Sequence, residues 1–146
     1  MKNNIVFITA IESVLSAHRS EAYKYSIESW KRWSGANDAV LRVLDEPLYD
    51  PEFMKPNYFR YFCHKLLEGE EYDQICLVDA DTIVHPNCPN FFNLTQGSFT
   101  AVREDGDMGW VIRSIDSYNH EFPTFFKKTF EIWDYFNSGV IVINKS

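Results

Sequence analysis

The sequence predicts an α/β domain with a mostly parallel central sheet flanked by helices. Two continuous apolar runs, at residues 5–9 and 75–78, are typical of strands buried on both faces. Between them lie two segments with apolar residues at helical spacing and a second strand pattern at residues 40–44. The resulting order of strand, helix, strand, helix and strand is that of an α/β fold.

The first strand, at residues 5–9, precedes a helix expected from Ser20 to Trp33. Ser20 can cap this helix, and Gly35 follows it as a stop. The apolar face of the helix consists of Tyr23, Ile27 and Trp30.

A second helix is expected between the strands at residues 40–44 and 75–78. It covers residues 57–67 and ends before Gly69. Its apolar residues at helical spacing are Phe59, Phe62, Cys63 and Leu66.

The second half of the chain has a looser pattern. Prolines 86 and 89 indicate a turn, followed by a short helix at 90–94 and a strand at 99–102. Residues 103–119 contain two glycines and no clear hydrophobic period, so we expect mainly a loop there. Such a loop could act as a lid, with Trp110 closing over a bound ligand. A third helix at 121–136 and a strand at 140–143 complete the expected elements.

Length and composition set limits on the partners and the location of the protein. The chain has 146 residues, enough for one domain, and its net charge of −7 argues against nucleic acid as a partner. The chain has three cysteines and no CxxC pair, which indicates a reducing compartment. It also has no apolar stretch long enough to cross a membrane, so we expect a cytoplasmic protein. His85 and Cys88 have zinc-ligand spacing, but no second pair accompanies them.

Two carboxylates at the end of the third strand are the main candidate for a functional site. The run ICLV leads directly into Asp79, Ala80 and Asp81. In open α/β sheets, ligands bind beyond the carboxyl ends of the strands, and residues two apart on an extended chain point the same way. Hard oxygen donors in this arrangement suit Mg²⁺ or Mn²⁺ together with phosphate oxygens.

Other interpretations of this Asp-x-Asp pair stay open at the level of the residues. One aspartate could cap a turn while the other is solvated. Residues 79–82 also resemble the first motif of haloacid-dehalogenase-like phosphatases, in which the first aspartate is a phosphoaspartyl nucleophile. That motif normally opens the domain, whereas here two strand–helix units precede it.

Two longer motifs resemble the GT-A-fold glycosyltransferases, in particular the family 8 type that includes glycogenins and bacterial galactosyltransferases. The first consists of the segment NYFR at 57–60 followed by ICLVDADTIV at 75–84. The second is FNSGVIVIN at 136–144. The resemblance extends over nearly the whole chain and implies a metal-dependent hexosyltransferase that uses a nucleotide-diphosphate sugar, with UDP as the expected nucleotide.

The resemblance also implies roles for individual residues. Asp79 and Asp81 would hold Mn²⁺ or Mg²⁺ and, with Asn137, form the catalytic set. Arg60 would reach the phosphate or sugar of the donor. The other residues expected to bind the donor are Ile8, Thr9, Ala10, Ala80, Ser138 and Gly139.

The sequence departs from the family pattern at two places, after the first strand and beyond the Asn-Ser-Gly motif. No tyrosine follows the first strand closely, and the family's third metal ligand, a histidine beyond the Asn-Ser-Gly motif, has no counterpart. His85 and His120 are candidate substitutes, and Asp105, Asp107 and Asp116 are candidate bases in the 103–119 segment.

The short chain has consequences for the expected activity. Residues 1–146 are expected to form a single GT-A-like nucleotide-sugar-binding domain without the usual C-terminal acceptor region. Such a form could hydrolyse sugar nucleotides, transfer sugar to a sugar or glycan acceptor, associate as a homo-oligomer, or act as a binding module without turnover.

Overall fold

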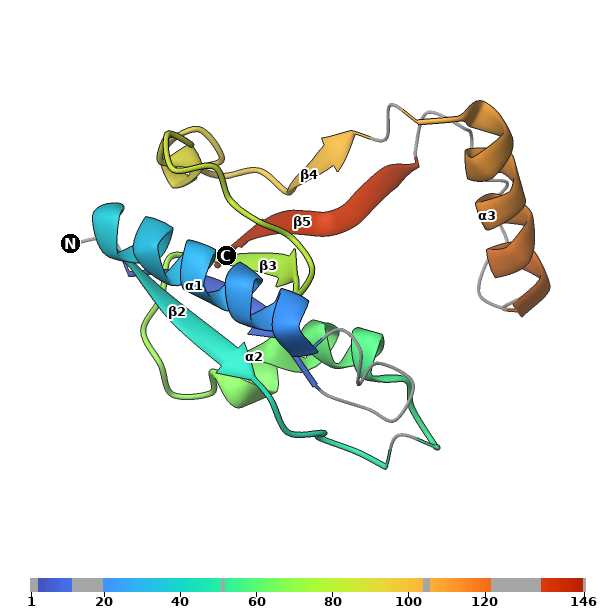
Figure 1. The fold of residues 1–146 in the computed structure, drawn as a ribbon, viewed down its shortest axis with the longest axis horizontal. Coiled ribbons are helices and arrows are strands. Elements are labelled where there is room, and N and C mark those ends of the chain that lie inside the picture. The colour runs from blue at the N-terminus through green and yellow to red at the C-terminus, as the bar shows by residue number, and fades with distance from the viewer. Residues whose placement is uncertain (1–2, 12–19, 51, 104–105, 122–134, 146) are drawn as a thin grey trace.

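The computed structural model describes residues 3–11, 20–50, 52–103, 106–121 and 135–145. Within these ranges five strands form a single sheet in the order β2-β1-β3-β5-β4 (Figure 1). The elements are β1 (Asn4–Thr9), α1 (Ser20–Ala36), β2 (Ala39–Leu44), the 3₁₀ helix η2 (Pro56–Phe62), α2 (Cys63–Leu66), β3 (Gln74–Asp79), the 3₁₀ helix η3 (Phe91–Asn93), β4 (Thr100–Arg103), α3 (Met108–Glu121) and β5 (Phe136–Asn144).

The sheet is mostly parallel, as the sequence predicted. Strand β1 pairs in parallel with both β2 and β3. Strand β5 runs antiparallel to β3 and to β4, so the other four strands share one direction. The expected strands at 5–9, 40–44, 75–78, 99–102 and 140–143 are therefore confirmed, each within a few residues of its predicted bounds.

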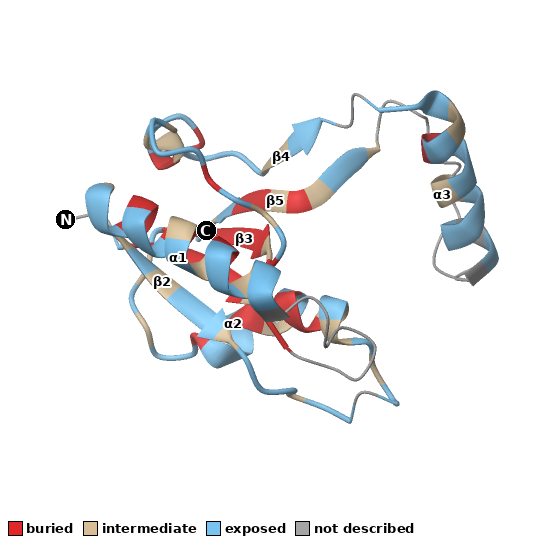
Figure 2. Ribbon diagram, viewed as in Figure 1, coloured by how far each residue is buried: buried red, intermediate tan, exposed pale blue. Residues whose placement is uncertain are grey.

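Helical segments cover the two faces of this sheet and create two core clusters. Alternate residues of β1 and β3 point to opposite faces, which explains why both strands are continuously apolar. One cluster contains Val6, Val78 and Trp30 of α1; the other contains Phe7, Leu77 and Cys63 of α2. Figure 2 shows β3 coloured mostly as buried, with further buried residues on the helix α1 that lies beside it.

Helix α1 extends past its predicted end. It runs to Ala36, so Gly35 lies inside the helix and the prediction that Gly35 stops it was wrong. The chain leaves the helical conformation at Asp38, which has a positive φ of 52°. The side chain of Asn37 also donates a hydrogen bond to the Trp33 carbonyl at 2.8 Å. Asn and Asp tolerate these conformations because their short polar side chains bond locally.

The second helix is mostly a 3₁₀ helix rather than the predicted α-helix. Residues 56–62 form η2, and only residues 63–66 are α-helical. Pro56 suits the first turn of η2, and Gly69 has a positive φ of 85° just after the segment, as expected for a stop.

The expectation of a loop at 103–119 was wrong for most of its length, because residues 108–121 form α3. The N–H of Gly109 donates to the Asp107 carboxylate at 2.8 Å, which is the arrangement of an N-cap. Val111 is buried and Ile115, four residues later, is half-buried, a helical spacing that the two glycines obscured. Trp110 is 46% exposed and packs edge-on against Tyr135.

The predicted helix at 121–136 falls largely on residues 122–134, which lie outside the described residues. At Phe136 the prediction was wrong, since this residue begins β5, whereas Glu121 is helical as expected and is the last residue of α3. Among the described segments, no helix has the length and apolar content that a membrane crossing requires.

Candidate functional site

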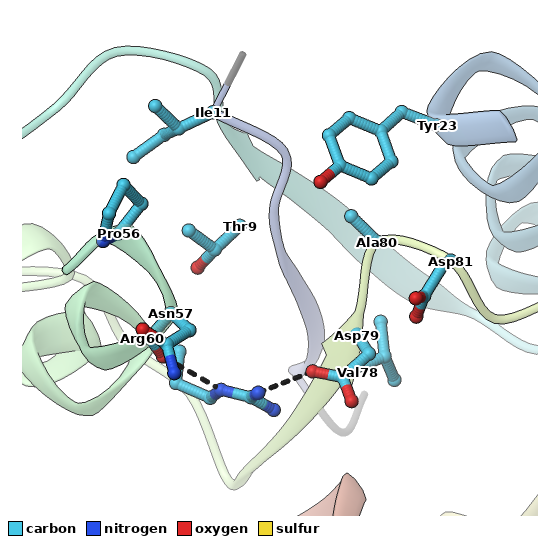
Figure 3. A pocket seen from close by; sticks show the side chains of 10 residues that line it. All are labelled: Thr9, Ile11, Tyr23, Pro56, Asn57, Arg60, Val78, Asp79, Ala80 and Asp81. Atoms are coloured by element: carbon cyan, nitrogen blue, oxygen red, sulfur yellow. Dashed lines mark hydrogen bonds and ion pairs between the residues drawn. The ribbon is translucent and has the colours of Figure 1, made fainter. Parts of the chain in front are cut away.

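A cavity of about 280 Å³ opens at the carboxyl ends of β1 and β3 (Figure 3). Side chains from β1, α1, η2 and the turn after β3 converge on it. The residues that line the cavity are Thr9, Ile11, Tyr23, Pro56, Asn57, Arg60, Val78, Asp79, Ala80 and Asp81.

The sheet topology explains why a cavity forms at this edge. Thr9 and Asp79 are the last residues of their strands and are register partners. The chain leaves β1 through α1 to reach β2 on one side, whereas β3 lies on the other side of β1. Adjacent strands whose connections depart in opposite directions leave a crevice between them, and ligands bind there in open α/β sheets.

Arg60 ties three elements together at the floor of this cavity. Its Nη2 forms an ion pair with Oδ1 of Asp79, and its Nη1 donates to the Ser138 carbonyl of β5 at 2.9 Å. Its Nε donates to the Asn57 carbonyl at 3.2 Å. Because Arg60 is only 8% exposed, the guanidinium is held in one place rather than solvated. The contact between Arg60 and Asp79 therefore differs from an ion pair between exposed surface side chains.

The two aspartates differ in their surroundings. Burial raises the pKa of Asp79, and the negative charge of Asp81 raises it further, while Arg60 acts in the opposite direction. Asp81 is exposed at the rim of the cavity. Together the carboxylates offer one oriented and one accessible oxygen-donor group at the same end of the cavity.

The turn after β3 fixes the position of this carboxylate pair. The Thr82 hydroxyl donates to the Asp79 carbonyl at 2.7 Å and accepts from Nε1 of Trp30 at 3.1 Å. The Thr82 N–H also donates to that carbonyl, at 3.1 Å. The core of α1 thus holds the turn that presents Ala80 and Asp81.

Gly139 allows β5 to pass close behind Asp79. A Cβ atom at this position would lie 3.1 Å from Oδ2 of Asp79 and 2.8 Å from Oδ1 of Asn137. The Gly139 N–H donates to that same Asn137 oxygen at 2.8 Å. Glycine is favoured here by close approach rather than by its conformation, since its backbone does not adopt a positive φ.

The predicted site residues fall into three groups. Thr9, Arg60, Asp79, Ala80 and Asp81 line the cavity. The Asn-Ser-Gly residues of β5 lie next to the cavity. The Ser138 carbonyl accepts a hydrogen bond from Arg60, and Gly139 lies close to the Asp79 carboxylate. Two other residues expected to bind the donor, Ile8 and Ala10, are packed in the core.

Sequence reasoning did not find Tyr23, Ile11 and Pro56 as lining residues. Tyr23 belongs to the apolar face of α1, and no local signal distinguishes a residue that packs on the sheet from one beside a cavity. The candidate bases have other surroundings. Asp107 caps α3, and its Oδ2 lies 3.9 Å from Nη2 of Arg113. Asp116 is exposed on the same helix. Asp105 lies outside the described residues.

The donor set is compatible with a hard divalent cation. Across the described ranges, no group of three or more His, Cys, Asp or Glu side chains is arranged to hold a metal ion. His85 and His120 do not line the cavity, and Nδ1 of His85 accepts from the Asn87 N–H at 3.1 Å. Asp79 and Asp81 could supply two carboxylate ligands, a number suited to Mg²⁺ or Mn²⁺ when diphosphate oxygens and water complete the shell.

Comparisons with known proteins agree with this architecture. The profile of the family described as Glycosyl transferase family 8 matches residues 5–146. No curated protein sequence matches the chain.

Two solved structures share the fold. One is a glycosyltransferase involved in the glycosylation of the major capsid of PBCV-1, with 11% identity and a TM-score of 0.61. The other is mouse xyloside xylosyltransferase 1 in its apo form, with 12% identity and a TM-score of 0.55. They match 98% and 97% of this chain, which spans 60% and 67% of their own lengths. At these identities the likeness shows the fold alone, and it confirms the expected GT-A type.

Proposed function

Because the chain belongs to glycosyl transferase family 8, we propose that it transfers a hexosyl group from a nucleotide-diphosphate sugar, with UDP as the nucleotide. The observation that carries this proposal is the Arg60–Asp79 ion pair with Asp81 beside it, at the crevice between β1 and β3. The acceptor is a sugar or glycan. Residues 1–146 form one nucleotide-sugar-binding domain in this proposal.

Divalent metal is part of the proposal. Asp79 and Asp81 would hold Mn²⁺ or Mg²⁺, which stabilises negative charge on a departing diphosphate as a Lewis acid. Arg60 keeps one Asp79 oxygen oriented, and β5 restricts the space around the other. In a protein of net charge −7, these carboxylates would otherwise repel a diphosphate.

Binding of UDP tests the proposal directly. Calorimetric titration with UDP should give binding with Mn²⁺ and none with EDTA. Asp81→Ala should weaken metal-dependent binding at least tenfold, or ~1.4 kcal/mol, because a bridging cation contributes several kcal/mol. Glu71→Ala is the matched control, since Glu71 is exposed before β3 and does not line the cavity.

Product analysis tests the reaction. NMR of the anomeric proton should show transfer with retention of configuration, as the family resemblance implies, and free sugar released without acceptor measures hydrolysis. Equal UDP affinity with Mn²⁺ and with EDTA would refute metal dependence. Tight binding of an intact donor over many hours would instead favour a binding module without turnover, and activity on phosphomonoesters alone would favour the phosphatase alternative.

A further inference from the structure

A second pocket lies between η2 and α3, separate from the cavity at β1 and β3. Its volume is about 230 Å³, and we call it the η2–α3 pocket. The residues that line it are Lys55, Tyr58, Ser114, Ser117 and Tyr118. None of these residues lines the cavity at β1 and β3, so the pocket is distinct from the site of the two aspartates.

The lining of the η2–α3 pocket combines one cationic group with hydroxyl groups and contains no carboxylate. Lys55 is exposed and forms no ion pair within the described part of the chain. A lysine ammonium group has three donors and no acceptor, and it binds anionic oxygens more strongly than neutral ones. In a protein of net charge −7, such a lining favours a ligand with a local negative charge.

Local backbone structure holds both walls of the pocket. Lys55 is extended, with φ −62° and ψ 138°, directly before the proline that begins η2, and a following proline restricts its backbone. The Lys55 carbonyl also accepts a hydrogen bond from the Tyr58 N–H at 3.0 Å. On α3, the spacing of Ser114, Ser117 and Tyr118 places them on one face of the helix. A ligand in the pocket is therefore contacted from two different elements.

The start of η2 separates this pocket from the cavity at β1 and β3. Pro56 and Asn57 line the cavity, whereas Lys55 and Tyr58 line the pocket. The Cα atoms of Lys55 and Asn57 are within about 8 Å of each other, because consecutive Cα atoms are about 3.8 Å apart. One saccharide chain can therefore extend from the pocket to the cavity in which the donor is proposed to bind.

We propose that the η2–α3 pocket recognises an acidic acceptor, a saccharide that carries a carboxylate or a phosphate group. The Lys55 ammonium group binds the anion, and the Ser114 and Ser117 hydroxyls hydrogen-bond to the sugar. Tyr58 offers the apolar face of its ring. This inference rests on the proposed function and specifies the chemical class of the acceptor. The pocket residues bind the acceptor and take no part in bond breaking.

Comparison of acidic and neutral saccharides tests this assignment. In ligand-observed NMR titrations with EDTA and without donor, methyl glucuronide or glucose-6-phosphate should bind about fivefold more tightly than methyl glucoside, because hydrogen bonds to charged groups are the stronger ones. The acid that binds more tightly identifies the anion. Inorganic phosphate should bind more weakly than glucose-6-phosphate, because it lacks a sugar that the serine hydroxyls can contact.

Two lysine variants and two serine variants locate the binding. Lys55→Met should remove the preference for the acid and leave the affinity for methyl glucoside within about twofold of the wild-type value. Lys65→Met should keep the preference, because Lys65 is an exposed lysine of α2 beside the Phe62 ring and does not line the pocket. Ser117 is exposed on α3, so both of its variants should fold. Ser117→Glu adds a carboxylate and should abolish binding of the acids, whereas the uncharged Ser117→Gln should retain it.

The transfer assay tests the role of the pocket in the reaction. With the best donor and Mn²⁺, the preferred acidic saccharide should have a lower KM than methyl glucoside. Lys55→Met should raise that KM about fivefold and leave kcat unchanged, because it removes binding of a group remote from the reacting atoms. An acidic saccharide that binds at the pocket but receives no sugar would overturn its assignment as the acceptor.

The remaining outcomes separate this inference from the proposed function. Equal affinities for acidic and neutral saccharides, or an unchanged preference in Lys55→Met, would overturn the inference. Inorganic phosphate that binds as tightly as glucose-6-phosphate would do the same, since the pocket would then hold an adventitious ion only. If UDP binds with Mn²⁺ in any of these cases, the proposed function stands. If no nucleoside diphosphate binds with Mn²⁺, the proposed function fails and the acceptor assignment fails with it.

Discussion

Replacement of Arg60 by methionine should lower the stability of the fold as well as donor binding. Methionine keeps the apolar length of the side chain but removes the guanidinium. The carbonyls of Asn57 and Ser138 then lose a donor, and Asp79 loses its cationic partner. Because these three groups belong to η2, β5 and β3, the change affects the junction of three elements.

The size of the effect follows from the surroundings of each interaction. A hydrogen bond contributes about 0.5–1.5 kcal/mol, so the two carbonyl bonds account for roughly 1–3 kcal/mol. Exposed ion pairs contribute about 0–1 kcal/mol, and breaking a buried pair costs about 3–5 kcal/mol. Arg60 is 10% and Asp79 36% exposed as side chains, so this pair is intermediate, at roughly 1–2 kcal/mol. The free energy of unfolding should therefore fall by about 2–5 kcal/mol.

Urea denaturation followed by tryptophan fluorescence measures this loss. Arg42→Met is the matched control, because Arg42 pairs with Glu70 at 2.9 Å and its side chain is 44% exposed, far more than the 10% of Arg60. Its loss should stay below about 1 kcal/mol. Arg60→Lys keeps the charge but cannot reach three partners with one ammonium group, so its loss should be intermediate.

A loss for Arg60→Met no larger than that for Arg42→Met would refute the reasoning. Arg60 would then contribute no more than a surface ion pair, and its bonds to Ser138 and Asn57 would have no energetic role. A double-mutant cycle with Asp79→Asn isolates the ion pair itself, and a coupling energy near zero would contradict its assigned share.

Two further predictions concern the glycines and the cysteines. Gly139→Ala should lower the free energy of unfolding by about 1–3 kcal/mol, because the added methyl group overpacks against Asp79, and it should also weaken UDP binding. Gly35→Ala is the control, because Gly35 lies in a helix with open space around it; this change should raise the free energy of unfolding by about 0.5–1 kcal/mol. Urea denaturation checks both, and equal effects would contradict the close approach at β5. In thiol labelling of the native protein, Cys88 should react first, because burial raises the pKa of the Cys63 and Cys76 thiols and keeps them from reagent. Rapid labelling of all three would contradict this.

Much of the fold could be read from the sequence because its signals are local. Continuous apolar runs at residues 5–9 and 75–78 identified strands buried on both faces, and the carboxylates after the second run line the cavity of the candidate site. Helix ends were less predictable. Gly35 was expected to stop α1, but the helix continued to Ala36 because packing of Trp30 and Trp33 on the sheet outweighs the low helix propensity of one glycine. The α3 helix was not predicted because Gly109 interrupts its short run of apolar residues at helical spacing.

Sequence alone determined that this chain has an α/β fold with an Asp79–Asp81 pair at a strand end, since both follow from the order of residues along the chain. Only the tertiary structure decided what surrounds that pair. Strand pairing places Thr9 beside Asp79, and the backbone path brings Arg60 to the Ser138 carbonyl. Tyr23 became a wall of the cavity for the same reason. Contacts between residues far apart in sequence depend on how the elements pack, and no local pattern encodes that packing.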